Sequence, residues 1–295
     1  MKFLNLAIPF FLFNSCMAQP AEIQTNTDNN TLFWEISGNH LSKPSYLFGT
    51  FHLMCKEDIN FSPGVKTAMT NAKEVFFEID LDDPANTLGA LFFMNMKGDK
   101  KLKDLFSEAD YIRFKSYFED SLGMPLTMFE RIKPNFLGAM LYPKMMPCKS
   151  MSGVEQELMS IAKKDKKEIK GFETMAFQAS VFDSIPYEKQ AKDLLNSIDS
   201  MSFYKANFDT LLNVYKTQQL SAIEDMFTKT EFGMEENRAV LLDNRNKNWV
   251  QQLIKILPAK NIFIAVGAGH LVGENGLITL LKKAGYTLRP LVNKN

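Results

Sequence analysis

YLFGTFHL, residues 46–53, is a short apolar run that stops at Gly49 and places His52 three residues later. The pattern recurs in IFIAVGAGHL, residues 262–271, where Gly267 precedes His270 by the same spacing. The chain has only three histidines, so two of them share G-x-x-H. Such a run is typical of a buried strand whose glycine allows a sharp exit and whose histidine lies just past the carboxyl end. We therefore expect both histidines at the same edge of one sheet.

The flanking sequence predicts the rest of an α/β fold. Residues 32–37 and 44–50 indicate a hairpin, with the third histidine, His40, exposed in its turn. Ser62 and Pro63 favour a helix start, and buried strands are expected over 74–81 and 167–173. Three- and four-residue apolar spacing predicts helices over about 84–146. We expect a central mixed sheet with parallel core strands flanked by helices and a large helical insertion between strands.

The composition is that of a folded globular protein long enough for one large domain or two small ones, and we expect a single α/β domain over residues 31–295. Hydrophobic residues make up 45% and charged residues 23% of the 295 positions. Lysine plus arginine and aspartate plus glutamate both number 34, so no net charge attracts nucleic acid. We expect no nucleic-acid partner. The 17 Met and 25 Phe are either core residues or the lining of an adaptable substrate groove.

The first residues have the pattern of an export signal. A lysine at position 2, an apolar run over 3–13 and small residues near 16–18 predict a signal peptide, residues 1–18, cleaved after Ala18. Residues 19–30 are polar and predict a flexible leader. The expected location is periplasmic or extracellular. A second interpretation takes Cys16 as a lipidation site, the one expected link to a membrane.

Two cysteines, Cys55 and Cys148, remain after cleavage at Ala18. An exported protein can join two such residues in a disulfide, whereas two buried free thiols are the alternative. Cys55 lies three residues after His52, so a disulfide there would fix the loop that carries this histidine.

Two glutamates complete the candidate site. Glu78 lies within one predicted buried strand and Glu173 ends another, where a carboxylate needs a metal or an arginine as its partner. Two histidines delivered to the same edge could bind a divalent metal or act as base and acid, although each one alone fits a core residue satisfied by a backbone group. The sequence contains none of the H-E-x-x-H, G-x-S-x-G, P-loop and dinucleotide motifs.

Taken in order, these motifs resemble the TraB/GumN family, which includes the TIKI metalloproteases. The resemblance rests on GTFH at 49–52, Glu78, GFET at 171–174 with Gln178, RN..W at 245–249 and GAGHLVG at 267–273, and it covers about 32–292. It implies a core related to erythromycin-esterase-like and haem-uptake ChaN-like proteins. It also implies metal-dependent hydrolysis of a peptide or protein substrate, with Mn or Co as the ion and Zn as another candidate.

On this basis the expected metal ligands are His52, His270 and one or both of Glu78 and Glu173, with one position open for water and a glutamate beside the ligands to take its proton. Arg245 is expected to stabilise the developing oxyanion or to orient a carboxylate, and the alternative is an arginine on a helix surface. Glu155 stands where many family members have aspartate, and a helix N-terminal carboxylate stabilised by the helix dipole is favoured over a ligand at this position. Two other functions stay open: a peptide- or haem-binding module without turnover, and a metal-independent esterase with His52 as base.

Overall fold

The computed structural model describes residues 22–84, 86, 92–228 and 236–294. The signal peptide over residues 1–18 and the lipidation site at Cys16 lie outside the described residues. None of the described helices combines the length and the apolar character needed to cross a bilayer.

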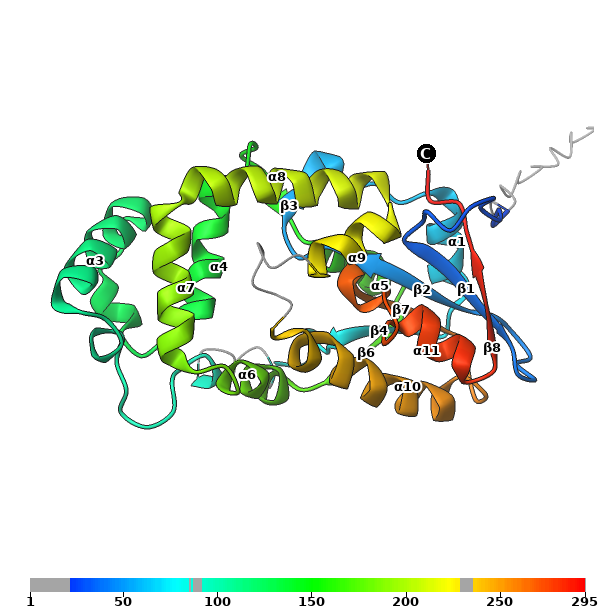
Figure 1. The fold of residues 1–295 in the computed structure, drawn as a ribbon. Helices are drawn as coiled ribbons and strands as arrows, with labels where there is room; N and C mark the ends of the chain where they lie inside the picture. Colours follow the sequence, from blue (N-terminus) through cyan, green and yellow to red (C-terminus); the bar gives the residue numbers. More distant parts are fainter. Residues whose placement is uncertain (1–21, 85, 87–91, 229–235, 295) are drawn as a thin grey trace, which may run out of the picture.

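A mixed sheet lies in the right half of the molecule as drawn in Figure 1. In the described part of the chain it has six strands in the order β6-β4-β7-β2-β1-β8. The strands are β1 (Phe33–Gly38), β2 (Ser45–Thr50), β4 (Glu74–Ile79), β6 (Glu168–Glu173), β7 (Ile262–Gly267) and β8 (Tyr286–Pro290). β6, β4, β7 and β2 are mutually parallel, whereas β1 and β8 are antiparallel to their neighbours. The expected α/β fold with parallel core strands is confirmed.

The central strands are covered on both faces. Every residue of β2 and of β4 is buried, so their sequences read as continuous apolar runs rather than alternating ones. The predicted hairpin is present, with Phe33 opposite Phe48. β2 and β4 are connected through α1 (Pro63–Asn71), where the Ser62 side chain caps the helix by accepting from the Val65 amide. β7 lies between β2 and β4, so this crossover does not join adjacent strands.

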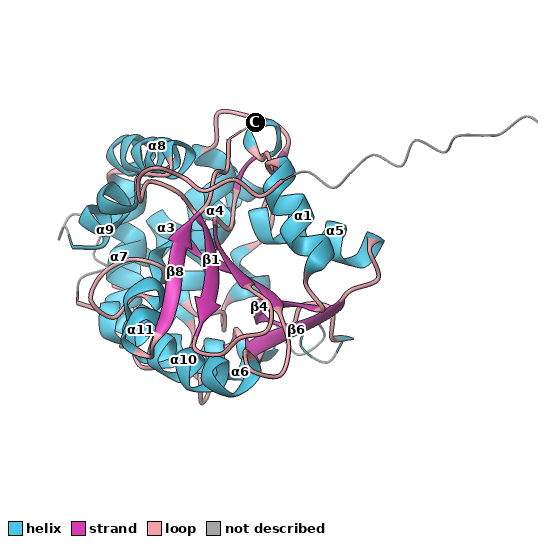
Figure 2. Ribbon diagram, turned by 90° about the vertical axis from the view of Figure 1, so that its right-hand side faces the viewer, coloured by secondary structure: helices cyan, strands magenta, loops and turns pink. Residues whose placement is uncertain are grey.

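Helices pack against the two faces of the sheet (Figure 2). α1 and α5 lie on one side, and α10 and α11 lie on the other. Their bounds are α5 (Val154–Lys164), α10 (Asn244–Ile256) and α11 (Leu277–Lys283). A π-helical turn (Ala239–Asp243) leads into α10, and a 3-10 turn (Ala268–His270) follows β7.

A second group of helices lies at the end of the molecule away from β1 and β8 (Figure 1). It contains α3 (Glu108–Leu122), α4 (Pro134–Met145) and α7 (Tyr187–Asp199), which enclose a separate hydrophobic cluster including Phe114, Phe118 and Leu137. α6 (Met175–Asp183), α8 (Met201–Thr217) and α9 (Leu220–Thr228) connect this group to the sheet. Along the chain, helical segments are thus inserted between β4 and β6, as expected, and also between β6 and β7.

Two links tie distant segments together. Cys55 and Cys148 are joined by a disulfide beside the small ladder of β3 (Met54–Cys55) and β5 (Met151–Ser152). The sequence left open either a disulfide or two free thiols, and the structure shows the disulfide. The described part of the predicted leader is hydrogen-bonded to the chain's last strand, because the Asn26 amide donates to the Pro290 carbonyl and the Val292 amide to that of Gln24.

Candidate functional site

The two G-x-x-H segments lie on neighbouring parallel strands. β2 and β7 pair so that Gly49 is opposite Val266 and Thr50 is opposite Gly267. Both strands end at this point, and His52 and His270 follow within three residues of their glycines. The expectation that the two histidines lie at the same carboxyl edge of one sheet is confirmed.

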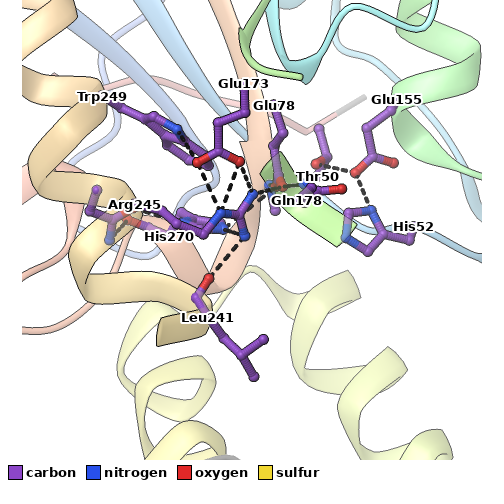
Figure 3. Close-up of polar contacts among 12 residues, drawn as sticks. Thr50, His52, Glu78, Glu155, Glu173, Gln178, Leu241, Arg245, Trp249 and His270 are labelled. Carbon is purple, nitrogen blue, oxygen red and sulfur yellow. Dashed lines mark hydrogen bonds and ion pairs between the residues drawn. The ribbon is translucent and has the colours of Figure 1, made fainter. Parts of the chain in front are cut away.

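His52 is held by a carboxylate from α5. Its Nδ1 lies 2.7 Å from Glu155 Oε1, which also accepts from the Thr50 hydroxyl at 2.6 Å (Figure 3). Glu155 is brought there by the chain before α5, since the Val154 amide donates to the Phe51 carbonyl at 2.9 Å. A carboxylate at Nδ1 keeps the proton on that nitrogen, so Nε2 is the atom that a neutral His52 offers to a ligand. The His52 side chain is 76% exposed.

His270 is buried and fixed on both ring nitrogens. Asn246 Nδ2 donates to the carbonyls of His270 and Asn275, which orients Asn246 Oδ1 toward His270 Nδ1 at 2.6 Å. Nδ1 therefore carries the proton and Nε2 carries the lone pair. Arg245 Nη1 lies 3.2 Å from that Nε2, and the Trp249 ring packs 4.4 Å from the imidazole.

Arg245 joins the two predicted glutamates. Its Nη2 donates to Glu78 Oε2 at 2.7 Å and to Glu173 Oε2 at 2.8 Å. Its Nε contacts both oxygens of Glu173, and Nη1 donates to the Leu241 carbonyl in the π-helical turn (Figure 3). Arg245 and both glutamates are less than 10% exposed. Of the two roles considered for Arg245, the structure shows a buried side chain that orients carboxylates.

Glu173 and Glu78 differ in how many hydrogen bonds their carboxylate oxygens accept. Glu173 Oε1 also accepts from Trp249 Nε1 at 2.8 Å, so both its oxygens are occupied by Arg245 and Trp249. Glu78 receives Gln178 Nε2 on Oε2 and the Gly267 amide on Oε1. Glu78 Oε1 lies 3.7 Å from His270 Nε2, which makes it the carboxylate oxygen that faces the histidine.

Gly267 marks the place where three of these side chains converge. A Cβ added at this glycine would lie 3.2 Å from Glu78 Oε1, 3.7 Å from His270 Cδ2 and 4.0 Å from His52 Cε1. A side chain here would press against the Glu78 carboxylate, which would have to shift by a few tenths of an ångström. Two imidazoles and one carboxylate oxygen around a common point are a donor set suited to a first-row divalent ion.

The ligand atoms of His52, His270, Glu78 and Glu173 are not all close enough together in this structure to hold one ion. Within the described residues, Cys55, Glu57 and Cys148 are the group whose ligand atoms all come within 4.8 Å, and its two sulfurs are joined in the disulfide. The four predicted ligands do not form such a group. The exposed His52 side chain is hydrogen-bonded to Glu155, whereas Glu173 is held by Arg245 and Trp249.

The charges of the site follow from burial and from these contacts. The Glu155 carboxylate raises the pKa of His52 to about 9. Burial lowers the pKa of His270 to about 3, so this imidazole is neutral at pH 7. Burial opposes ionisation of Glu78, but the positive charges of His270 when protonated and of Arg245 hold its pKa well below the usual range. Burial raises the pKa of Glu173, against the hydrogen bonds of Arg245.

Sequence reasoning underestimated Glu155 and gave Asn246 no role. Glu155 was expected to serve the helix dipole rather than the site, whereas it contacts His52 directly. Asn246 stands in the RN..W pattern next to Arg245, and this adjacency was the available signal. On α10, successive residues 245 and 246 reach His270 from two sides.

The chain is similar to proteins of one known family over most of its length. The TraB/PrgY/gumN family profile matches residues 32–290. Similar curated proteins include Metalloprotease TIKI1 of Danio rerio, 22% identical over 91% of this chain and 65% of that protein. Metalloprotease TIKI1 of Homo sapiens is 22% identical over 92% of this chain and 63% of that protein. The Xenopus tropicalis TIKI1 is 25% identical over 87% and 61%. The chain thus spans less than two thirds of the length of these relatives.

Proposed function

The chain belongs to the TraB/PrgY/gumN family, and from this premise we propose that it is an exported, metal-dependent peptide hydrolase. The observation that carries the proposal is the convergence of His52, Glu78 and His270 around Gly267. Relatives named as metalloproteases imply a metal cofactor. We propose Mn²⁺ or Co²⁺ as the ion, with Zn²⁺ as a further candidate, and an unstructured peptide or protein segment as the substrate.

The chemistry of the donors fits such an ion. His52 Nε2, His270 Nε2 and Glu78 Oε1 are the atoms that would hold it, leaving a position open. Glu173 is assigned to orienting Arg245, since both its oxygens already accept hydrogen bonds. When bound, a divalent ion would polarise the scissile carbonyl and make the attacking water more acidic.

The chain's own residues prepare this chemistry. Glu155 holds one proton of His52 on Nδ1, and Asn246 does the same for His270, so Nε2 is the ring nitrogen of each that would bind an ion. At His270 the ion would replace the contact between Nε2 and Arg245 Nη1. His52 has to lose its second proton before it can bind a cation. Arg245 keeps the carboxylate of Glu78 in place through its Nη2 and is itself held by Glu173 and the Leu241 carbonyl.

A second function is favoured by the position of Arg245. Its guanidinium already lies between Glu78, Glu173 and His270, so a positive charge is present there without an ion. A metal-independent hydrolase could use this charge for the oxyanion, and His52 as the base once the pH is high enough to deprotonate it, near its pKa of about 9. The main proposal and this one differ in their response to a chelator.

The test combines metal analysis with cleavage of a peptide library. The wild type is expected to bind about one divalent ion and to cleave unstructured peptides only when Mn²⁺ or Co²⁺ is restored after chelation. His52→Ala and His270→Ala are expected to lose both properties. The matched control is His40→Asn, because His40 lies in an exposed turn with a φ of 60° that asparagine tolerates.

Three results would contradict the proposal in different ways. Ester or peptide hydrolysis that is insensitive to chelator would favour the metal-independent enzyme. Saturable binding of a peptide or haem without any product would favour a binding module. Normal metal binding in both histidine variants would place the ion elsewhere in the molecule.

A further inference from the structure

The chain after His270 folds into a tight turn, residues 271–276, which contacts Asn246. The side-chain amide of Asn246 donates to the Asn275 carbonyl in this turn at 2.8 Å and to the His270 carbonyl at 3.3 Å. Within the turn, Gly273 has a φ of 89°, a left-handed conformation that favours glycine, and its carbonyl accepts from the Gly276 amide at 3.1 Å. The NH2 group of Asn246 is thus bound by two backbone carbonyls.

These two carbonyls determine which tautomer His270 adopts. A primary amide has its donor nitrogen and its acceptor oxygen on one carbon, so binding the NH2 group on one side directs Oδ1 to the other. Asn246 Oδ1 lies 2.6 Å from His270 Nδ1 and can accept only when that nitrogen carries the proton. If the amide turned round, its NH2 group would face Nδ1, and the imidazole proton would move to Nε2.

Two charged residues hold the turn in place. Asp243 Oδ2 accepts from Asn275 Nδ2 at 3.2 Å, and Arg238 Nη2 donates to the Val272 carbonyl at 3.3 Å. Arg238 Nε and Asp243 Oδ1 lie 3.4 Å apart. A Cβ added at Gly273 would overlap Arg238 Nη2, so a larger residue there would push the guanidinium away from the turn.

The π-helical turn brings Arg238 and Asp243 to the same side of the chain. It is closed by the Asn244 amide, which donates to the Ala239 carbonyl five residues earlier. An α-helix would place residues five apart at about 140° to each other around its axis. The wider π-helical turn brings such residues closer to alignment, and turns of this kind are frequent at functional sites.

The arrangement of Arg238 and Asp243 is not the one that would stabilise the fold most. Their side chains are only 17% and 16% exposed. Among the residues that the structure describes, Arg238 Nη1 and Asp243 Oδ1 are buried and have no hydrogen-bond partner. Buried polar atoms without a partner lower the free energy of unfolding, and natural proteins retain such arrangements chiefly at functional sites.

We propose that Arg238 and Asp243 are positioning residues for His270. By holding the turn over residues 271–276, they orient Asn246 and keep the imidazole in the tautomer whose Nε2 carries no proton. The consequence for ion binding rests on the proposed function, in which His270 Nε2 is a ligand. The tautomer itself is a property of the metal-free protein and can be measured without an ion.

The experiment reverses the contact between Asp243 and Asn275. In Asn275→Asp two carboxylates face each other, and their repulsion moves the turn away from Asp243. The double exchange Asn275→Asp/Asp243→Asn restores one donor and one acceptor at the same place. Long-range ¹H–¹⁵N NMR of the metal-free protein distinguishes the protonated from the unprotonated nitrogen of His270. Electron paramagnetic resonance measures the affinity for Mn²⁺ separately, and circular dichroism establishes that each variant is folded.

The wild type is expected to carry the proton on Nδ1. Asn275→Asp should populate the tautomer protonated on Nε2 and weaken Mn²⁺ binding about tenfold or more, and the double exchange should reverse both effects. Asn275→Ala, which keeps the carbonyl, and Arg238→Gln should change both readings in the same direction. The matched control is Asn248→Asp, the same replacement at an exposed position of α10 whose side-chain oxygen accepts from Gln252, and it should change neither.

Wild-type nitrogen shifts at His270 in both Asn275→Asp and Asn275→Ala would overturn the inference. A folded double variant that keeps the shifts of Asn275→Asp would overturn it as well. A tautomer change that the double exchange reverses, without any change in Mn²⁺ affinity, would support the positioning role and contradict the ion site at His270. The two proposals therefore fail by different readings.

Discussion

At the scale of single residues, the contact between His52 and Glu155 sets the properties of the site. The carboxylate fixes the tautomer of the imidazole and makes it more basic, as outer carboxylates do for histidines that bind metals. Because the raised pKa belongs to the folded state, the pair stabilises the fold below the unfolded pKa, and this contribution is lost as the pH rises through about 9. Glu155 is thus a positioning residue for His52.

Replacing Glu155 by glutamine should return His52 to ordinary basicity. Without the negative charge, we expect the pKa of His52 to fall from about 9 toward about 6.5. Imidazole NMR titration of the metal-free protein measures this directly, because the chain has only three histidines. Thr50→Val is the matched control, since it removes the other hydrogen bond to Glu155 Oε1 but keeps the charge. A pKa for His52 that stays near 9 in Glu155→Gln would contradict the assignment.

The sequence was sufficient to find residues whose signal is local. G-x-x-H at the ends of two apolar runs predicted where His52 and His270 lie, and the register of β2 and β7 confirms it. The partner of Glu155 was not predictable, because α5 reaches His52 through a backbone contact between residues 51 and 154. The occupation of Glu173 by Arg245 and Trp249 depends likewise on α10 packing across the ends of β4 and β6.

At the scale of elements, the strands were more predictable than the helices. Continuous apolar runs identify β2, β4 and β7 because these strands are buried on both faces. The helices after β6 join the α3 and α4 cluster through α7, and no local pattern indicates which helices share a core. A buried ion pair helps to make this connection: Lys133 at the start of α4 lies 2.9 Å from Asp183 at the end of α6.

The Lys133–Asp183 pair should make the helical part sensitive to acid. Burial opposes ionisation of Asp183, but Lys133 and the Tyr187 hydroxyl overcome it and hold the pKa of Asp183 below its usual value. Because a depressed carboxylate pKa stabilises the fold above the unfolded pKa, this stability is lost as the pH falls below about 4. Urea unfolding should be measured as a function of pH. The free energy of unfolding should fall less on acidification in Asp183→Asn than in the wild type.

The exposed Asp193 offers a control for that measurement. It pairs with Lys189 on the surface of α7, where ion pairs contribute little to stability. Asp193→Asn should retain the pH dependence of the wild type. If acid lowers the free energy of unfolding of Asp183→Asn as much as that of the wild type, the buried Lys133–Asp183 pair does not cause the acid sensitivity.

At the scale of the whole molecule, the disulfide joins the two segments that hold the His52–Glu155 contact. Cys55 follows His52 in the loop after β2, and Cys148 precedes β5 and α5. The two cysteines are separated by 93 residues, so the bond closes a long loop in the unfolded chain. The sequence alone could not decide whether Cys55 and Cys148 form a disulfide or remain free thiols, because only the fold brings the two cysteines together.

Removing this disulfide should cost considerable stability. For a loop of this length, chain entropy predicts a loss of about 4–5 kcal/mol in the free energy of unfolding for Cys55→Ser/Cys148→Ser. Urea unfolding of the oxidised wild type and the double variant measures the difference. The same loss is expected for the wild type in reductant, while the double variant should not respond to reductant. A loss below about 1 kcal/mol would show that the bond does not constrain the unfolded chain as proposed.

The central claim is that the two G-x-x-H histidines bind one metal ion. Pulsed electron paramagnetic resonance of bound Mn²⁺ in protein labelled with ¹⁵N-histidine tests it most directly, because it detects imidazole nitrogens that coordinate the ion. We predict coupling to two histidine nitrogens in the wild type and in His40→Asn, and to one at most in His52→Ala or His270→Ala. Bound Mn²⁺ without histidine coupling, or coupling that survives in both alanine variants, would contradict the account.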